Sequence, residues 1–333
     1  MIFAHLTRHW MARRRDYSLA SWLLCIARSL RVLAYYREHR DLCRLGVYRN
    51  HVAAGPEDDP FHHLSHRDYL IKGLPARRRV QAVLSHYRFE ETTFNDAYMQ
   101  AVYGARCLPL WRHEAVDQAG GEAGKAGGAG AVSSFMIQLE VASRSNAEGD
   151  LTVALVADGK CLHRLSFSWL EGRLVGLDAP IVPFIARNQG RWTDSGAAFE
   201  AFERVFPNNS PSFFCFAAMQ GIAQAVGMDK VMAIRSDAHI AYDPHPDKHF
   251  ANAYDGFWKI LGGVDMTGGS GYLIDLPFYV KPLSEMPSKH RKRAAQRREH
   301  WRQIGDSARA TLQRHLLHAR SHVEHPAPAL EPA

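Results

Sequence analysis

A histidine and a serine fall in the sequence where a buried strand is expected to end. Ser236 and His239 follow Lys230–Ile234, a short apolar run typical of such a strand. Loops at strand ends often carry function because a rigid scaffold positions them. An imidazole titrates near neutral pH, so we predict His239 as a general base with Ser236 and Asp255 as catalytic partners. The alternatives are that His239 makes ordinary loop hydrogen bonds and that Asp255 caps or pairs with a basic helix.

Aromatic side chains gather just beyond these residues. Tyr254, Phe257 and Trp258 lie within one short stretch. We predict that Tyr254 and Trp258 contact a ligand. The competing interpretation for Phe257 and Trp258 is burial in the core, where large aromatic side chains are usually found.

Other histidines lie in loops. His62, His63 and His66 fall in one turn-rich segment, and His245 and His249 fall in another. Metal ions need ligands that converge in a fixed geometry, and the five cysteines include no Cys-x-x-Cys pair. We therefore predict no metal site, with a loop site at His245 and His249 as the alternative, and we expect His62, His63 and His66 to matter less to function than His239.

Positive charge is concentrated at both ends of the chain, whose formal net charge is +7. Residues 1–50 carry ten Arg and three acidic residues, and residues 289–302 carry seven Lys or Arg and one Glu. This charge favours acidic partners, namely anionic lipid, nucleic acid or phosphate-bearing ligands. Nucleic acid is the weakest of the three because no reading module or base-stacking pattern is present.

Two segments could contact a membrane surface. Residues 18–37 carry an apolar stripe at helical spacing, formed by Leu19, Trp22, Leu23, Ile26, Leu30 and Leu33. We predict that this stripe contacts an anionic membrane surface or lipid. Lys289 and Arg291 of the basic C-terminal helix are predicted to bind the same anionic ligand. The alternatives are a stripe packed on the core and a solvated basic helix.

The compartment is expected to be the cytoplasm. The longest apolar run, residues 19–27, is too short to span a bilayer. The cysteines are odd in number and show no disulfide spacing, which suits a reducing compartment. We therefore expect a cytoplasmic protein that is peripheral at the inner membrane; the sequence predicts no oligomeric state.

Hydrophobic periodicity predicts an α+β fold with a helical N-terminal part and an antiparallel meander. Strands are expected at residues 135–142, 151–157, 162–169, 173–184 and 230–234, with a hairpin turn at Asp158-Gly159, and helices at 194–206 and 211–226. The Gly/Ala-rich tract 118–131 lacks the Gly-Lys-Ser/Thr ending of a phosphate loop and predicts a flexible insertion before the first strand. The predicted parts are a helical region 1–117, the tract 118–131, an α+β sheet domain 132–284, a basic helix 285–320 and a disordered tail 321–333.

Several runs follow one another in a recognisable order. They are AYDGFWKILGG (253–263), GYLIDLP (271–277) and MPSKHRKRAAQRREHW (286–301), preceded by SHYRF (85–89) and SDAHI (236–240). In this order they resemble the VirK/YbjX family of bacterial proteins, over residues 50–305. The resemblance implies a role in virulence, envelope integrity and resistance to antimicrobial peptides. His86, in the SHYRF run, is a further candidate ligand-binding residue.

Two stretches depart from the family pattern. The chain reads VGLDA at residues 175–179, with Asp178-Ala179 in place of the second half of Gly-Gly-Leu-Gln-Gly. It reads NNSPS at 208–212, where the family tends to have Gly-Leu-Arg-Pro-Lys before a helix. The resemblance implies that the family's glycines and its Arg/Lys pair bind an anionic ligand. Both are missing from this chain.

The order of meander, helix and strand also resembles the acyl-CoA-dependent N-acyltransferase (GNAT-like) fold. In that fold a splayed strand pair and a helix N-terminus bind the pantetheine and pyrophosphate. The helix starts near Thr193 and Ser210 are the candidates here, although neither follows the Arg/Gln-x-x-Gly-x-Gly/Ala run of such enzymes. We therefore keep three functions: VirK/YbjX-like envelope support first, an acyltransferase with acyl-CoA as cofactor second, and nucleic-acid binding third.

Overall fold

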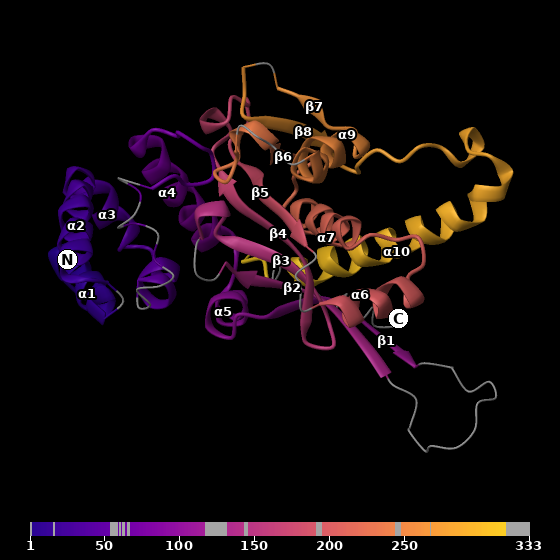
Figure 1. The fold of residues 1–333 in the computed structure, drawn as a ribbon, viewed down its shortest axis with the longest axis horizontal. Coiled ribbons are helices and arrows are strands. Elements are labelled where there is room, and N and C mark those ends of the chain that lie inside the picture. Colours follow the sequence, from indigo (N-terminus) through magenta and orange to yellow (C-terminus); the bar gives the residue numbers. More distant parts are fainter. Residues whose placement is uncertain are drawn as a thin grey trace, which may run out of the picture.

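The protein is an α+β structure built on one mixed sheet (Figure 1). The computed structural model describes residues 2–15, 17–53, 59, 61, 64, 67–116, 132–142, 146–190, 195–243, 248–266 and 268–317. The tract 118–131 and the tail 321–333 lie outside these ranges, so their predicted flexibility stays a prediction.

Eight strands form the sheet in the order β1-β2-β3-β4-β5-β6-β8-β7. In that order their bounds are Leu108–Val116, Val132–Val141, Leu151–Ala157, Lys160–Leu170, Val182–Gly190, Lys230–Ile234, Gly271–Asp275 and Val264–Asp265. Neighbouring strands are antiparallel except β5 and β6, which are parallel. The predicted meander is confirmed and is extended by a parallel junction.

The hairpin between β3 and β4 forms for the reason that the sequence suggests. Asp158 and Gly159 have φ values of 47° and 77°. Two consecutive positive φ values give the tight turn whose twist matches that of paired strands, and Asp-Gly favours it. β3 is almost wholly buried, which explains why its sequence is apolar rather than strictly alternating.

Two strands differ from the prediction. β1 precedes the Gly/Ala-rich tract, so the expectation that the tract stands before the first strand is wrong: the tract joins β1 to β2, which pair as far as Val116 and Val132. The strand predicted at 173–184 starts later, since Gly172–Leu174 is a 3-10 turn and β5 runs from Val182. β1 was not predicted as a strand because it contains Arg112, His113 and Glu114. These polar residues suit an exposed edge strand rather than a buried one.

Helices α6 (Gly196–Val205), α7 (Pro211–Ala225) and α10 (Ser288–Gln313) cover the sheet (Figure 1). α7 packs against β3, β4 and β5 and also against α10, so nearly all of it is buried. A Cβ added at Gly221 would lie 2.2 Å from the Gly305 carbonyl oxygen, which shows how closely α7 and α10 approach. The helices predicted at 194–206 and 211–226 are confirmed, as is a long basic helix near the C-terminus.

The N-terminal helices lie at one end of the sheet, beyond α4 (Figure 1). They are α1 (Ile2–Ala12), α2 (Leu19–Ser29) and α3 (Tyr36–Leu42), and α4 (Ala76–Thr93) packs against β4. The predicted helix 18–37 is divided, because a 3-10 segment over Leu30–Tyr35 separates α2 from α3. No helix in the described ranges combines the length and the apolar composition needed to cross a bilayer.

The remaining helices are short. They are α5 (Asp96–Met99), α8 (Lys248–Ala251) and α9 (Phe257–Ile260), and a π-helical turn over Asn252–Gly256 joins α8 to α9. The aromatic segment around Tyr254 is therefore helical. It follows β6 in the chain and lies close to β5, which places it beside the parallel junction.

Candidate functional site

The sheet opens where β5 and β6 meet. These strands pair only at Phe184 with Met232 and at Ile185 with Ala233, although β5 continues to Gly190. A cavity of about 570 Å³ lies beside the end of β5 that continues past this pairing, and its volume is typical of a small-molecule site. Its walls come from the end of β5, the aromatic segment after β6 and the start of α7, and include Asn188, Gln189, Gly190, Ser210, Ser212, Ala253, Tyr254 and Phe257.

The start of α7 faces this cavity. Ser210 is the N-cap residue, but its side chain does not cap the helix; its Oγ lies 2.7 Å from Oγ of Ser212. The first N–H groups of a helix have no partners within the helix and carry partial positive charge. Pro211 at the first turn fixes the backbone for helix entry. Pro211 itself has no N–H, and the Phe213 N–H donates to the Ser210 carbonyl at 3.1 Å, so the Ser212 N–H is the group of this first turn that is left to meet a negatively charged ligand.

A second cavity, of about 470 Å³, lies on the other side of the same helix start. It shares Asn209 and Ser210 with the first and is also lined by Lys281, Phe213, Tyr279, Arg297, Arg298 and Trp301. Three buried atoms beside it have no hydrogen-bond partner among the described residues: Asn209 Oδ1, Arg297 Nε and Trp301 Nε1. Since buried polar atoms are normally paired, this arrangement suits a polar ligand.

Tyr254 borders the first cavity and is surrounded by N–H groups. The Asn188 backbone N–H and the Gln189 side-chain amide donate to its hydroxyl oxygen at 3.4 and 3.3 Å, and His239 Nε2 lies 3.0 Å away. The Ala241 backbone N–H donates to His239 Nδ1, so the neutral ring carries its proton on Nε2. The phenol oxygen accepts hydrogen bonds from Asn188 and Gln189, whereas the single Nε2–H of His239 also has the Ala186 carbonyl as an acceptor. Tyr254 is 0% exposed, and burial raises the pKa of its hydroxyl, so the phenol is protonated at neutral pH.

His239, the predicted general base, is completely buried. Burial lowers its pKa to about 4, so the ring is neutral at pH 7. Its Nε2 also lies 3.4 Å from Glu148 Oε1, and Glu148 forms an ion pair of 3.3 Å with Arg187. The contact of His239 with the cavity runs through Tyr254, so the geometry gives this ring a positioning role there.

Ser236 and Asp255 form a separate pair. The backbone N–H and the hydroxyl of Ser236 donate to the two carboxylate oxygens of Asp255 at 2.9 and 2.5 Å. In the described part of the chain no side-chain hydrogen bond links this pair to His239. The fold thus brings the three predicted catalytic residues to one region, but the serine proton is directed to Asp255, and the pair holds the loop after β6 against the aromatic segment.

Trp258 and His86 are buried far from solvent. Trp258 is 0% exposed and donates its Nε1–H to the Ile234 carbonyl at 2.9 Å, so it packs in the core beneath the site. His86 in α4 is also 0% exposed, and its Nδ1 accepts from the Trp169 backbone N–H at 3.3 Å. Burial lowers the pKa of His86. Neither side chain borders the two cavities described above.

The basic residues predicted to bind ligand are exposed on α10. Lys289 lies at the start of the helix, and Arg291 donates to the carbonyls of Met286 and Ser284 at 2.9 and 3.2 Å. Arg291 thus stabilises the turn before the helix. The basic residues that do border a cavity, Arg297 and Arg298, lie further along α10.

The loop histidines are not placed. His62, His63, His66 and His245 lie outside the described residues, and for His249 only the backbone is described. Two groups at the site carried no signal in the sequence: Asn209, whose NNSPS run was noted only as a departure, and His163, whose Nε2 lies 2.7 Å from Asn188 Oδ1.

The comparisons with known proteins identify a family whose function is unknown. The chain matches the family described as "Protein of unknown function (DUF535)" over residues 30–308, which is most of its length. This range contains the runs that carry the VirK/YbjX resemblance, β5, β6, α7 and both cavities. No curated protein and no solved structure matched the chain. The chain belongs to the DUF535 family of proteins of unknown function.

Proposed function

We propose that this chain is an acyltransferase that takes its acyl group from a coenzyme A thioester bound between β5 and β6. The observation that carries the proposal is the cavity of about 570 Å³ at the parallel junction, which ends at the start of α7. A splayed parallel pair exposes backbone N–H and C=O groups to an extended ligand, and a peptide-like arm can pair with them. The acyl-CoA N-acyltransferase fold uses this arrangement, which the order of elements here resembles.

Charge supports the same donor. The pyrophosphate would lie against the Ser212 N–H at the start of α7, where the helix dipole favours anions. The second cavity continues from that point and offers Lys281, Arg297 and Arg298 to further phosphate, with Trp301 as an aromatic surface. These side chains supply the basic groups that the NNSPS run lacks.

The reaction would need little beyond what the cavity offers. An acceptor amine attacks the thioester carbonyl, the carbon–nitrogen bond forms, and the carbon–sulfur bond breaks. The nitrogen loses a proton to solvent, and the departing sulfur takes one from Tyr254, which regains it from solvent. Burial raises the pKa of Tyr254, and the N–H groups of Asn188 and Gln189 act in the opposite direction, because they would stabilise the tyrosine oxygen while its proton is absent.

The VirK/YbjX resemblance supports an envelope component as the acceptor of the acyl group. It points to envelope integrity, virulence and resistance to antimicrobial peptides, and acylation of an envelope component would change how such peptides bind the surface. The acceptor in this proposal is therefore an amine carried by an envelope lipid or protein, and the enzyme works from the cytoplasmic side of the inner membrane.

Binding of coenzyme A tests the donor site directly. Calorimetric titration of the full chain is expected to give a micromolar Kd for coenzyme A. Arg297→Ala/Arg298→Ala should weaken binding by about 100-fold or more, since each of the two charge-assisted hydrogen bonds is worth about 1.5–3 kcal/mol. The matched control is Lys292→Ala/Arg293→Ala, which removes two exposed basic side chains from the same helix and should bind normally. Absence of binding by the wild type, or equal affinities for all three proteins, would refute the donor site.

A second function, docking to an anionic membrane surface, is favoured by the outer face of α2. Leu19 and Leu23 of the apolar stripe and the neighbouring Leu24 are 58%, 53% and 50% exposed, so these leucines face solvent, whereas Trp22, Ile26 and Leu33 of the stripe are partly buried. Arg14 and Arg31 are exposed nearby. Leucines flanked by arginines suit a bilayer that carries negative headgroups, because the apolar side chains enter the interface and the charges remain at the phosphates.

Vesicle flotation is expected to show this contact. The wild type should float with vesicles that contain anionic lipid and much less with neutral ones, because apolar burial and charge act together. Leu19→Ser/Leu23→Ser/Leu24→Ser should lower recovery on anionic vesicles at least about fivefold, since roughly 1.5–3 kcal/mol is lost for each leucine that was fully inserted. Val264→Ser, which alters an equally exposed apolar residue on β7, should float like the wild type. Equal flotation on both kinds of vesicle, or on neither, would contradict the proposal.

A further inference from the structure

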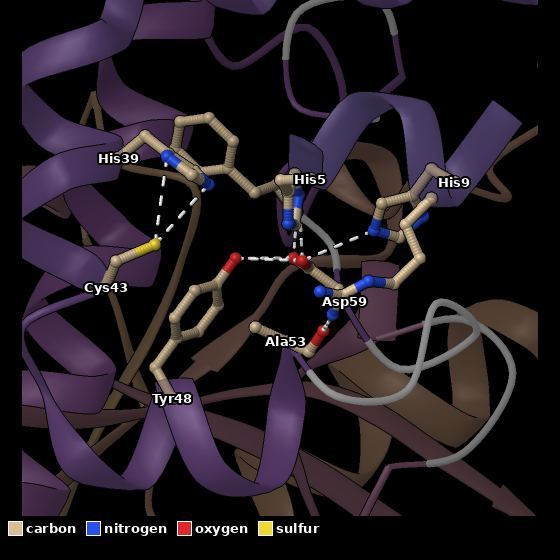
Figure 2. Close-up of polar contacts among 9 residues, drawn as sticks. His5, His9, His39, Cys43, Tyr48, Ala53 and Asp59 are labelled. Atoms are coloured by element: carbon tan, nitrogen blue, oxygen red, sulfur yellow. Dashed lines mark hydrogen bonds and ion pairs between the residues drawn. The ribbon is translucent and has the colours of Figure 1, made fainter. Parts of the chain in front are cut away.

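The N-terminal helices enclose a cluster of imidazoles around one carboxylate (Figure 2). His5 and His9 lie one turn apart on α1, so both rings leave the same face of the helix. Their Nε2 atoms are 3.0 and 3.4 Å from Oδ2 of Asp59. The three side chains therefore converge on one point from two segments that are far apart in the sequence.

This cluster is dry and rigidly supported. His5, His9 and Asp59 are 7%, 2% and 1% exposed. The Tyr48 hydroxyl lies 2.9 Å from each carboxylate oxygen, and the Phe61 backbone N–H donates to Oδ1 at 2.9 Å. Oδ1 is thus fixed by these donors while Oδ2 faces the imidazoles, as Figure 2 shows for Tyr48 and the two rings. Supporting hydrogen bonds of this kind orient metal ligands.

The distances match the coordination shell of a small divalent ion. Zinc binds imidazole nitrogen and carboxylate oxygen at about 2.0–2.2 Å, so two ligand atoms in a tetrahedral site lie about 3.3 Å apart. The two nitrogen–oxygen separations here bracket that value, and all three ligand atoms lie within 4.8 Å of one another. A pair of neutral imidazoles with one carboxylate is also a common ligand set for zinc.

We propose that His5, His9 and Asp59 bind one divalent transition-metal ion, with Zn²⁺ the best match, and that this ion ties α1 to the rest of the chain. The fourth position is left to water. α1 lies before residue 30, where the match to the family begins, and the ion would join it to Asp59 within the matched range. Its role is structural, because both cavities beside α7 are lined by other parts of the chain.

Metal analysis of the untagged full-length chain is the test. Protein dialysed against Zn²⁺ and then against buffer should retain about one ion per chain, and Co²⁺ should give the visible absorption bands of a tetrahedral nitrogen and oxygen site. His9→Gln and Asp59→Asn should each weaken Zn²⁺ binding by about 100-fold or more, because even loss of a supporting hydrogen bond costs 10- to 100-fold. The control His290→Gln, at an exposed histidine of α10, should bind like the wild type.

Two further measurements keep the outcome clear. Zn²⁺ should raise the melting temperature of the wild type and of His290→Gln, and not that of His9→Gln, because a ligand of the native state stabilises it. The triple variant His62→Ala/His63→Ala/His66→Ala should keep the ion, and its loss there would assign the metal to those loop histidines and overturn the proposal. A wild type that retains no Zn²⁺ and gives no Co²⁺ bands also overturns it, whether or not the variants fold.

Discussion

Tyr254→Phe is expected to lower kcat for acyl transfer by about 100-fold, because loss of a positioned proton donor typically costs 10²–10⁴-fold. The substitution removes only the hydroxyl group that accepts from Asn188 and Gln189. The dissociation constant for coenzyme A should stay within about twofold of the wild-type value, since the phosphates are held elsewhere. Stopped assays of thiol release, with calorimetry for binding, separate the two quantities.

Comparison of two donors distinguishes a proton donor from a merely structural tyrosine. A thioester whose leaving thiol is more acidic needs less protonation, so its rate should fall less in the variant than the rate of acyl-CoA. His239→Gln is a second variant for this comparison. It disturbs the position of Tyr254 but leaves the phenol proton donor in place. If Tyr254→Phe transfers acyl groups at the wild-type rate, Tyr254 is no acid catalyst and the proposed proton path is wrong.

Glu90 is expected to make the stability of the protein depend strongly on pH. Its carboxyl group is completely buried in α4, and burial raises its pKa to about 8, although hydrogen bonds from Trp169, Tyr98 and Tyr103 act in the opposite direction. The folded state therefore keeps a proton that the unfolded state has already released above pH 4.5. Stability from this group is complete below pH 4.5 and declines as the pH rises to about 8.

Denaturant unfolding at pH 6 and pH 8 measures the effect. Between pH 6 and pH 8 the wild type should lose about 2 kcal/mol from this group, since one pH unit corresponds to about 1.36 kcal/mol until the folded-state carboxyl itself begins to ionise near pH 8. Glu90→Gln carries no titrating proton and should remove most of that loss, whereas Glu285→Gln, at an exposed position, should retain it. A wild type and a Glu90→Gln variant with the same pH dependence would show that Glu90 is ionised in the folded protein.

The parts of the fold that depend on local pattern could be predicted. The meander, the Asp158-Gly159 turn and the helices at 194–206 and 211–226 follow from residues close in sequence, and the structure confirms them. β1 was missed because an edge strand needs no apolar alternation. The α+β class followed from the order of these elements, and the GNAT-like comparison stays a proposal.

The site could be predicted only in part, because its parts meet through tertiary contacts. Tyr254 and the start of α7 near Ser210 were identified from local sequence. The hydrogen bond of 3.3 Å from Arg297 to the Asn208 carbonyl joins residues that are 89 positions apart. No short sequence pattern predicts such a contact. For the same reason the spacing of His5 and His9 was uninformative until Asp59, which lies 50 positions after His9, was placed beside them.

The hairpin of β1 and β2 makes the protein a convenient host for a reporter. The two strands pair as far as Val116 and Val132, so the ends of the intervening tract lie next to each other at the tip of an edge hairpin. A fluorescent protein whose own termini are adjacent could replace the tract while the strand pairing stays closed, since insertions succeed at such loop tips. Both cavities are lined by other elements, so a fusion at this point would let the chain be followed in living cells with its ligand sites untouched.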